Sequence, residues 1–172
     1  MASGGFGRLS TGMAKPSAGL LPYRVLGGKL EVLLVHPGGP FWAGRDEGAW
    51  SLSKGEIDEA EDPLAAARRE FTEETGFVAE GEFLPLGSIR QKSGKIVAAW
   101  AVEMTADPAR LRSNLFPLEW PPKSGTMKEF PEVDRAGWFP LDEARRKLLP
   151  AQLPFIERLA ELAPGRRARE SS

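Results

Sequence analysis

Residues 55–77 read Gly55-Glu56-Ile57-Asp58-Glu59-Ala60-Glu61-Asp62-Pro63-Leu64-Ala65-Ala66-Ala67-Arg68-Arg69-Glu70-Phe71-Thr72-Glu73-Glu74-Thr75-Gly76-Phe77. Asp62 followed by Pro63 is typical of a helix start, because aspartate is a favoured N-cap and proline loses no hydrogen bond at the first helical position. Gly76 supplies the left-handed residue that commonly ends a helix. The stretch therefore predicts one helix over residues 63–75.

The second half of this helix carries Glu70, Glu73 and Glu74, which fall within one sector of its surface. Like charges at these spacings repel by roughly 0.2–0.5 kcal/mol per pair, and the negative end of the helix dipole disfavours each by roughly 0.3–1 kcal/mol. A bound divalent cation offsets both the repulsion between the glutamates and the unfavourable effect of the helix dipole. Carboxylate oxygens suit Mg²⁺ and Mn²⁺, so the spacing predicts a site for one of these ions.

The alternative is a solvated acidic face, because charge runs usually lie on the surface. Leu64, Ala67 and Phe71 form an apolar stripe beside the acidic sector, which therefore borders a buried face. Arg69 is spaced to pair with Glu73 one turn further on and so to fix its rotamer. These neighbours favour a metal site over plain surface.

The stretch resembles the signature box of the Nudix hydrolases. The box is a glycine, five residues, a glutamate, seven residues and then Arg-Glu-apolar-x-Glu-Glu-x-Gly-apolar. Its fixed positions are Gly55, Glu61, Arg69, Glu70, Phe71, Glu73, Glu74, Gly76 and Phe77. The resemblance implies an α/β fold of the Nudix type, an α/β/α sandwich with a mixed β-sheet.

The resemblance also implies roles for the residues of the box. The metal ligands would be three carboxylates and a backbone carbonyl: Glu70, Glu73, Glu74 and Gly55 or its neighbour Lys54. Glu70 or Glu73 would help to deprotonate the attacking water. Arg69 would orient the glutamates. Glu61 would either contact the ligating residues or make an outer contact to the metal.

Many Nudix hydrolases add a further glutamate from a distant loop. Glu132 lies six residues before Trp138, an arrangement that resembles the diadenosine tetraphosphate hydrolases of this superfamily. We expect Glu132 to be an additional metal ligand or general base. One alternative is that Glu132 is an ordinary surface carboxylate. Another is that the additional ligand or base is one of three other acids: Glu103, Glu119 or Glu129.

Contacts to the substrate are predicted by residue type. Candidate phosphate contacts are cations near the predicted metal site: Lys54, Arg45, Lys92 and Lys95. Candidate stacking partners for a base are loop aromatics: Trp42, Trp120 and Phe41. Each of these residues is otherwise ordinary surface. The single histidine, His36, is more often structural than catalytic in such a position.

Composition limits the alternatives. The chain has 172 residues, 41% of them hydrophobic, and a formal net charge of −1. This is typical of one globular domain with no general attraction for nucleic acid polymers. The absence of cysteine excludes disulfides, thiolate metal sites and cysteine catalysis, and it fits a reducing cytoplasm. No apolar run is long enough to predict a membrane span.

The ends of the chain differ from its middle. Residues 1–12 are rich in glycine and serine and predict a disordered extension, with Met13 as a second plausible start. We expect residues 13–163 to form a single domain. The basic residues 164–172 predict a flexible tail.

Six further segments have the character of strands: Gly19–Arg24, Lys29–His36, Trp50–Ser53, Phe83–Arg90, Lys95–Glu103 and Ala136–Phe139. Gly27-Gly28 predicts a hairpin between the first two. Residues 106–131 are proline-rich and predict a long irregular loop, and amphipathic helices follow at residues 141–149 and 153–162.

These features predict a metal-dependent pyrophosphohydrolase that cleaves a nucleoside diphosphate linked to another group, with dinucleoside polyphosphates as the first substrate class. Nucleoside triphosphates and nucleotide sugars are the alternative substrates.

A nucleotide-binding module without turnover is a different class of function, and the intact glutamates of the box argue against it. The isoprenoid diphosphate isomerases of the superfamily rely on a cysteine, which this chain lacks. An RNA-cap hydrolase would be expected to carry a basic groove. The sequence predicts no partner beyond the small nucleotide substrate and leaves the oligomeric state open.

Overall fold

The computed structural model describes residues 15–162, so the predictions for residues 1–12 and 164–172 lie outside it. The described chain contains strands and helices with these bounds: β1 (Ser17–Leu26), β2 (Lys29–Pro37), β3 (Ser53–Glu56), α2 (Pro63–Thr75), β4 (Phe83–Arg90), β5 (Ile96–Glu103), η1 (Pro108–Arg110), β6 (Leu115–Glu119), β7 (Met127–Pro131), β8 (Val133–Pro140), α3 (Leu141–Lys147), η2 (Pro150–Gln152) and α4 (Leu153–Leu162). The hairpin predicted at Gly27-Gly28 is confirmed, and both glycines have positive φ.

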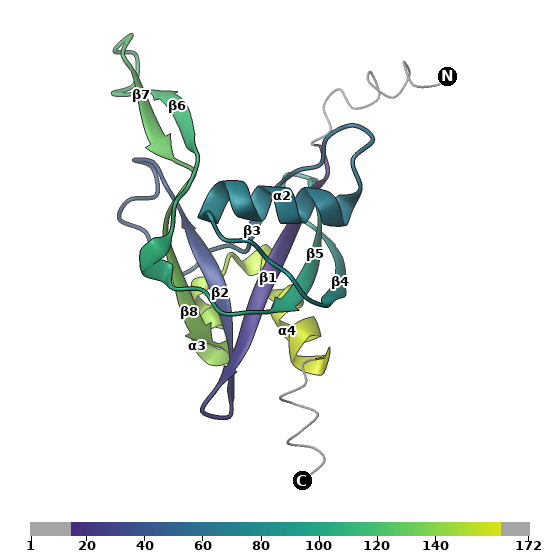
Figure 1. Cartoon of the computed structure of the whole chain (residues 1–172). Helices are drawn as coiled ribbons and strands as arrows, with labels where there is room; N and C mark the ends of the chain where they lie inside the picture. Colours follow the sequence, from purple (N-terminus) through teal and green to yellow (C-terminus); the bar gives the residue numbers. More distant parts are fainter. Residues whose placement is uncertain (1–14, 163–172) are drawn as a thin grey trace.

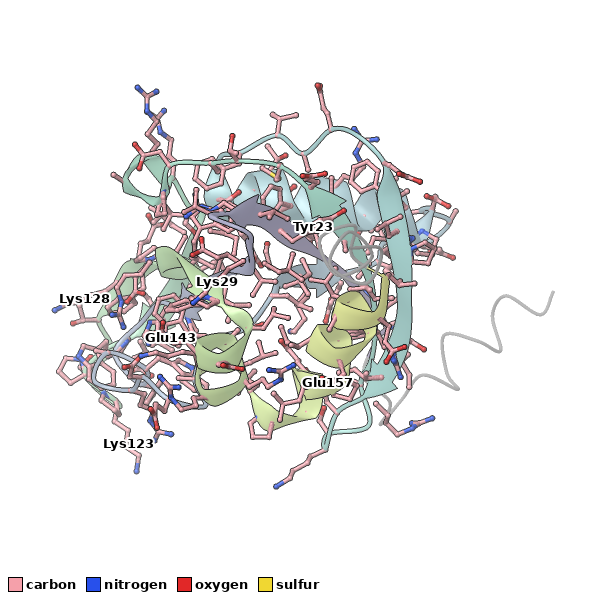
Figure 2. The ribbon with its side chains drawn as sticks, turned by 90° about the horizontal axis from the view of Figure 1, so that it is seen from below. Tyr23, Lys29, Lys123, Lys128, Glu143 and Glu157 are labelled. Carbon is pink, nitrogen blue, oxygen red and sulfur yellow. The ribbon has the colours of Figure 1, made fainter. Side chains whose placement is uncertain are left out.

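Six strands form one sheet in the order β4-β5-β1-β2-β8, with β3 paired to β1. β1 and β5 run parallel, while the other pairs are antiparallel. Helix α2 lies on one face of this sheet, and α3 and α4 lie on the other (Figures 1 and 2). The predicted α/β/α sandwich with a mixed sheet is therefore confirmed.

One edge of β1 serves two partners. Residues Tyr23–Leu26 pair with β2, whereas residues Ser17–Leu20 pair with β3. β3 therefore takes the place along β1 that β2 leaves. This arrangement brings Lys54 and Gly55 to the start of β1, under the helix that carries the glutamates.

Each face of the sheet has its own buried cluster. Phe71 and Ala67 of α2 are fully buried against Leu20 and Leu33 of the sheet. On the opposite face, buried side chains of α4 pack against the strands, and the largest is Phe155. At about 25 cal/mol per Å² of apolar surface, burial in the first of these clusters supplies most of the driving force that holds α2 in place.

Two predictions about the strands need correction. The strand expected at Trp50–Ser53 begins later, at Ser53, because the residues that pair with β1 are Ser53–Glu56, while Trp50 and Ser51 form only isolated bridges. The prediction of an irregular loop over residues 106–131 was wrong, since this region contains η1 and the β6–β7 hairpin. Among the strands of residues 15–162, those of this hairpin pair only with each other, and Pro117 within β6 obscured the strand pattern.

The β6–β7 hairpin projects away from the body of the molecule (Figure 1). Phe116 and Phe130 pair across it with ring centroids 6.1 Å apart. At its end, Trp120 meets Phe41 of the β2–β3 connection edge to face, with centroids 5.4 Å apart. This contact joins the hairpin to the β2–β3 connection. Within residues 15–162, no helix is long and apolar enough to span a membrane.

Candidate active site

Helix α2 has the boundaries that the sequence predicted. The Asp62 carboxylate accepts a hydrogen bond of 3.0 Å from Ala65 N. Gly76 closes the helix with φ 79°, and its N–H donates to the Thr72 carbonyl over 2.8 Å. The bulky apolar side chain of Phe71 is buried on the inner face, which turns the neighbouring glutamates toward the edge of the sheet.

Gly55 lies directly against the carboxylate of Glu70. A Cβ atom built at this position would collide with Cδ, Oε1 and Cγ of Glu70. Any other residue would displace either β3 or the glutamate. The glycine of the signature box is therefore required by the close approach of the strand to the helix.

The glutamates of α2 border a cavity of about 490 Å³. Its walls are strongly polar and come from six parts of the chain: Ser17, Lys54, Gly55, Glu56, Glu70, Glu73, Glu74, Lys95, Asn114 and Glu132. The structure thus brings Glu132 to the same cavity as the α2 glutamates, although about sixty residues of sequence separate them. It also brings Lys54 and Lys95 there.

Arg69 ties the carboxylates on one side of the cavity together. Its guanidinium donates to both oxygens of Glu61 at 2.8 and 2.9 Å, and to Glu70 Oε2 at 3.0 Å. Contacts to Glu73 are longer, at 3.4 Å, and Nη2 also donates to the Glu56 carbonyl at 3.2 Å. The predicted Arg69–Glu73 pair is present, but the strongest partner of Arg69 is Glu61.

The charges of this network shift the pKa values in opposite directions. The hydrogen bonds from Arg69 lower the pKa of Glu61 to about 2, helped by the bond from Asp58 N. The same pairing raises the pKa of Arg69, which stays charged. Burial is the main cause that raises the pKa of Glu70, while Arg69 opposes the shift.

Glu74 is the carboxylate in the least polar surroundings. Burial raises its pKa to about 8, and the charges of Glu70 and Glu132 add to this. A hydrogen bond of 2.9 Å from Ser53 Oγ acts in the other direction. Burial raises the pKa of Glu132 as well. Several carboxylates are therefore held where an added positive charge would lower their free energy.

These residues fit a divalent cation by the chemistry of their donors, because hard carboxylate oxygens from three separate segments border one cavity. Among residues 15–162, no three acidic or histidine side chains already form a set of metal ligands. Oxygens of Glu70 and Glu74 are engaged instead by Arg69 and by Ser53. Each of these two carboxylates keeps its second oxygen for a metal ion.

A second cavity of about 220 Å³ adjoins the first and shares three residues with it: Lys54, Glu74 and Glu132. Its other walls are largely apolar and include Trp42 and Leu149. Lys54 is mostly buried between the two cavities, and burial lowers its pKa, with Lys95 adding to the effect. The pair of cavities thus offers a charged compartment beside an apolar one.

Four of the predicted substrate contacts line neither of these cavities: Arg45, Lys92, Trp120 and Phe41. Arg45 lies over the ring of Trp42, with its Cζ 5.5 Å from the centroid. Lys92 borders a different cavity beside Pro150, and Trp120 contacts Phe41 at the hairpin. Their roles in substrate binding stay predictions.

Three residues of the charged cavity were not among the candidates from the sequence, namely Ser17, Glu56 and Asn114. Asn114 lies in the connection before β6 and has no local motif that could have identified it. His36, expected to be structural, is fully buried and bonds to Asp134 at 2.8 Å and to the Arg45 carbonyl at 2.7 Å.

Comparison with known proteins places the chain in a family. The model of the NUDIX domain matches residues 14–159. An RNA pyrophosphohydrolase of Agrobacterium fabrum is 27% identical over 165 residues, covering 81% of this chain and 90% of that protein. An RNA pyrophosphohydrolase of Caulobacter vibrioides is 37% identical over 86 residues, covering 47% of this chain and 46% of that protein.

Solved structures share the fold. A C. elegans Ap4A hydrolase in a binary complex has a TM-score of 0.62 and 22% identity, covering 87% of this chain and 98% of that one. The NUDIX domain of Shewanella oneidensis NrtR, complexed with ADP ribose, has a TM-score of 0.60 and 21% identity, covering 87% and 88%. Members of this family hydrolyse phosphoanhydrides and generally use divalent metal ions. With the family model spanning most of its length, the chain belongs to the NUDIX domain family of hydrolases.

Proposed function

We propose that the chain is a metal-dependent pyrophosphohydrolase that cleaves a nucleoside diphosphate linked to another group, with dinucleoside polyphosphates as its first substrate class. One observation carries the proposal: a cavity bordered by carboxylates opens beside an apolar cavity that contains Trp42. A polyphosphate fits the first and a base fits the second. Lys54 borders both and would contact the phosphates between them.

The carboxylates would hold the metal in the charged cavity. Candidate ligands are Glu70, Glu73, Glu74, Glu132 and the backbone at Gly55. Bound Mg²⁺ or Mn²⁺ supplies charge neutralisation of the phosphate oxygens and acidifies water. Arg69 fixes the glutamates through the hydrogen bonds described above, so that their oxygens lose little freedom when the substrate binds.

The reaction itself needs one proton acceptor. The oxygen of a water molecule attacks phosphorus, the P–O bond of the anhydride breaks, and its electron pair leaves with the released phosphate group. Glu70, Glu73 or Glu132 would take the proton of the water. Lys54 and Lys95 offer positive charge beside the cavity where negative charge grows on the phosphates.

Product identification tests the proposal. Diadenosine polyphosphates, nucleoside triphosphates and nucleotide sugars are each incubated with the protein and Mg²⁺ or Mn²⁺ in heavy-oxygen water. We expect the label in a phosphate product, with the fastest turnover for a diadenosine polyphosphate. Label in a carbon-linked alcohol would reject the reaction class. Nucleotide binding without cleavage at any metal concentration would identify a binding module instead.

A second candidate substrate is an RNA that carries a phosphoanhydride. The observation in its favour is that the Agrobacterium relative, matched over 90% of its length, is an RNA pyrophosphohydrolase. The net charge of −1 argues against it, because a chain with no excess of positive charge gains little from the phosphates of a polymer. A higher kcat/KM for triphosphorylated RNA than for diadenosine polyphosphates would favour the second candidate.

Trp42 is expected to determine the affinity for the base. Its partly exposed ring borders the apolar cavity, so its stacking lies at the lower end of the range for a base, about 1 kcal/mol. Trp42→Ala should therefore raise KM about fivefold with little change in kcat. Steady-state kinetics with a diadenosine polyphosphate measures this. Phe41→Ala changes the other candidate ring on the same loop, and it should leave KM unchanged because Phe41 is more exposed and borders neither cavity. An unchanged KM in Trp42→Ala would exclude the ring from the substrate site.

A further inference from the structure

Residues 112–114 join the end of α2 to the segment that carries Glu132. Arg112 N donates to the Thr75 carbonyl and Asn114 N to the Glu73 carbonyl, both over 2.9 Å. These carbonyls belong to the last turn of α2 and have no partner within the helix. The connection before β6 therefore caps the C-terminal end of the helix that carries the glutamates.

The same three residues also hold the backbone around Glu132. Glu132 N donates to the Asn114 carbonyl over 2.9 Å. Val133 N donates to Ser113 Oγ over 3.0 Å, and that hydroxyl donates in turn to the Asn114 carbonyl over 3.0 Å. The Ser113 hydroxyl thus acts as acceptor and donor at once, and it also contacts Asn114 Oδ1 at 3.4 Å.

Asn114 is the shortest bridge between the two acidic segments. Its backbone N–H donates to the carbonyl of Glu73, and its backbone carbonyl accepts from the N–H of Glu132. On the far side, Gly38 N donates to the Glu132 carbonyl over 2.9 Å. Both polar groups of the Glu132 backbone are therefore paired, and the bridge fixes the position of Glu132 relative to Glu73.

We propose that Ser113 is a positioning residue for the hydrolysis proposed above. Its hydroxyl holds the Asn114 carbonyl and the Val133 N–H, and through them it sets the position of the Glu132 carboxylate across the cavity from Glu73. Ser113 itself borders neither of the two cavities, so it acts through Glu132. This inference rests on the proposed function for the role of Glu132.

Replacement of Ser113 tests the proposal through kinetics. Loss of one neutral hydrogen bond should lower kcat about 3–10-fold in Ser113→Ala and leave KM nearly unchanged. Ser113→Thr keeps the hydroxyl and should recover most of the rate. The control is Ser124→Ala, which removes a hydroxyl that accepts from Thr126 N at the exposed end of the hairpin, where the neighbouring Lys123 points away from the body (Figure 2). We expect wild-type kinetics for it.

A double variant separates positioning from general stability. In a Glu132→Gln background, Ser113→Ala should cost no further rate, because both changes act on the same carboxylate. The same loss of kcat in both backgrounds would overturn the proposal, as would a higher KM with kcat unchanged. A wild-type protein that hydrolyses no anhydride would refute the proposed function instead. In that case, calorimetry tests the positioning role of Ser113 without turnover. A Mn²⁺ affinity 3–10-fold weaker in Ser113→Ala than in the wild type supports positioning, and equal affinities reject it.

Discussion

Glu70→Gln is expected to lower kcat by about 10²–10⁴-fold, the range for loss of a group that takes part in proton transfer. Glutamine has nearly the same size, so it keeps the packing against Gly55 while it removes the charge. The fold should survive, because Glu70 lies at the edge of the buried cluster and Phe71 holds the helix in place. Steady-state kinetics and thermal unfolding of the same preparation measure the two effects separately.

The matched control for this substitution is Glu80→Gln. Glu80 is exposed in the connection after α2 and borders neither of the two cavities. It should keep the wild-type kcat. If Glu70→Gln stayed within threefold of the wild type, Glu73 or Glu132 would have to be the proton acceptor, and Glu70 would lose its place in the mechanism.

The second large effect is expected for Arg69→Met, which should weaken metal binding or turnover by about 10–100-fold. This is the usual cost of removing a group that orients metal ligands. Methionine keeps an unbranched apolar stem but leaves Glu61, Glu70 and Glu73 without their shared cation. Arg69→Lys should restore only part of the function, because an ammonium cannot donate to both oxygens of Glu61 in the same geometry.

Arg69→Met should also lower stability in a manner that depends on pH. The pKa of Glu61 is about 2 in the folded protein, below its ordinary value of 4.5, so the pairing stabilises the fold fully above about pH 4.5. Its contribution disappears as the pH falls toward 2. The difference in the free energy of unfolding between wild type and Arg69→Met should therefore shrink over that interval. Urea unfolding at several pH values measures it, and a constant difference would contradict the assignment.

The sequence predicted the parts of the site that depend on neighbours along the chain. Asp62, Pro63 and Gly76 set the limits of α2 by local backbone chemistry, and the spacing of its glutamates follows from the helical repeat. Glu132 was predicted through resemblance to a family, and the structure brings it to the cavity of Glu74.

Other parts were hidden because they depend on contacts between distant segments. The β6–β7 hairpin was missed because Pro117 interrupts its strand pattern, and its pairing is visible only in space. Asn114 acts through backbone groups, which every residue has, so its residue type gives no signal. The Ser113 hydroxyl bonds to Val133 N, twenty residues further along the chain, and no local motif marks such a pair. That a residue is a lysine likewise does not reveal where it lies in the fold. Lys92 borders a cavity lined by neither α2 nor Glu132.

The wall common to the two cavities constrains how this protein can change. Lys54, Glu74 and Glu132 face both compartments, so a substitution chosen to accept a new leaving group would disturb the reacting end at the same time. Trp42, by contrast, borders the apolar compartment alone. Selection for altered preference, in nature or in a directed-evolution library, should therefore accumulate changes on the β2–β3 connection and leave the common wall intact.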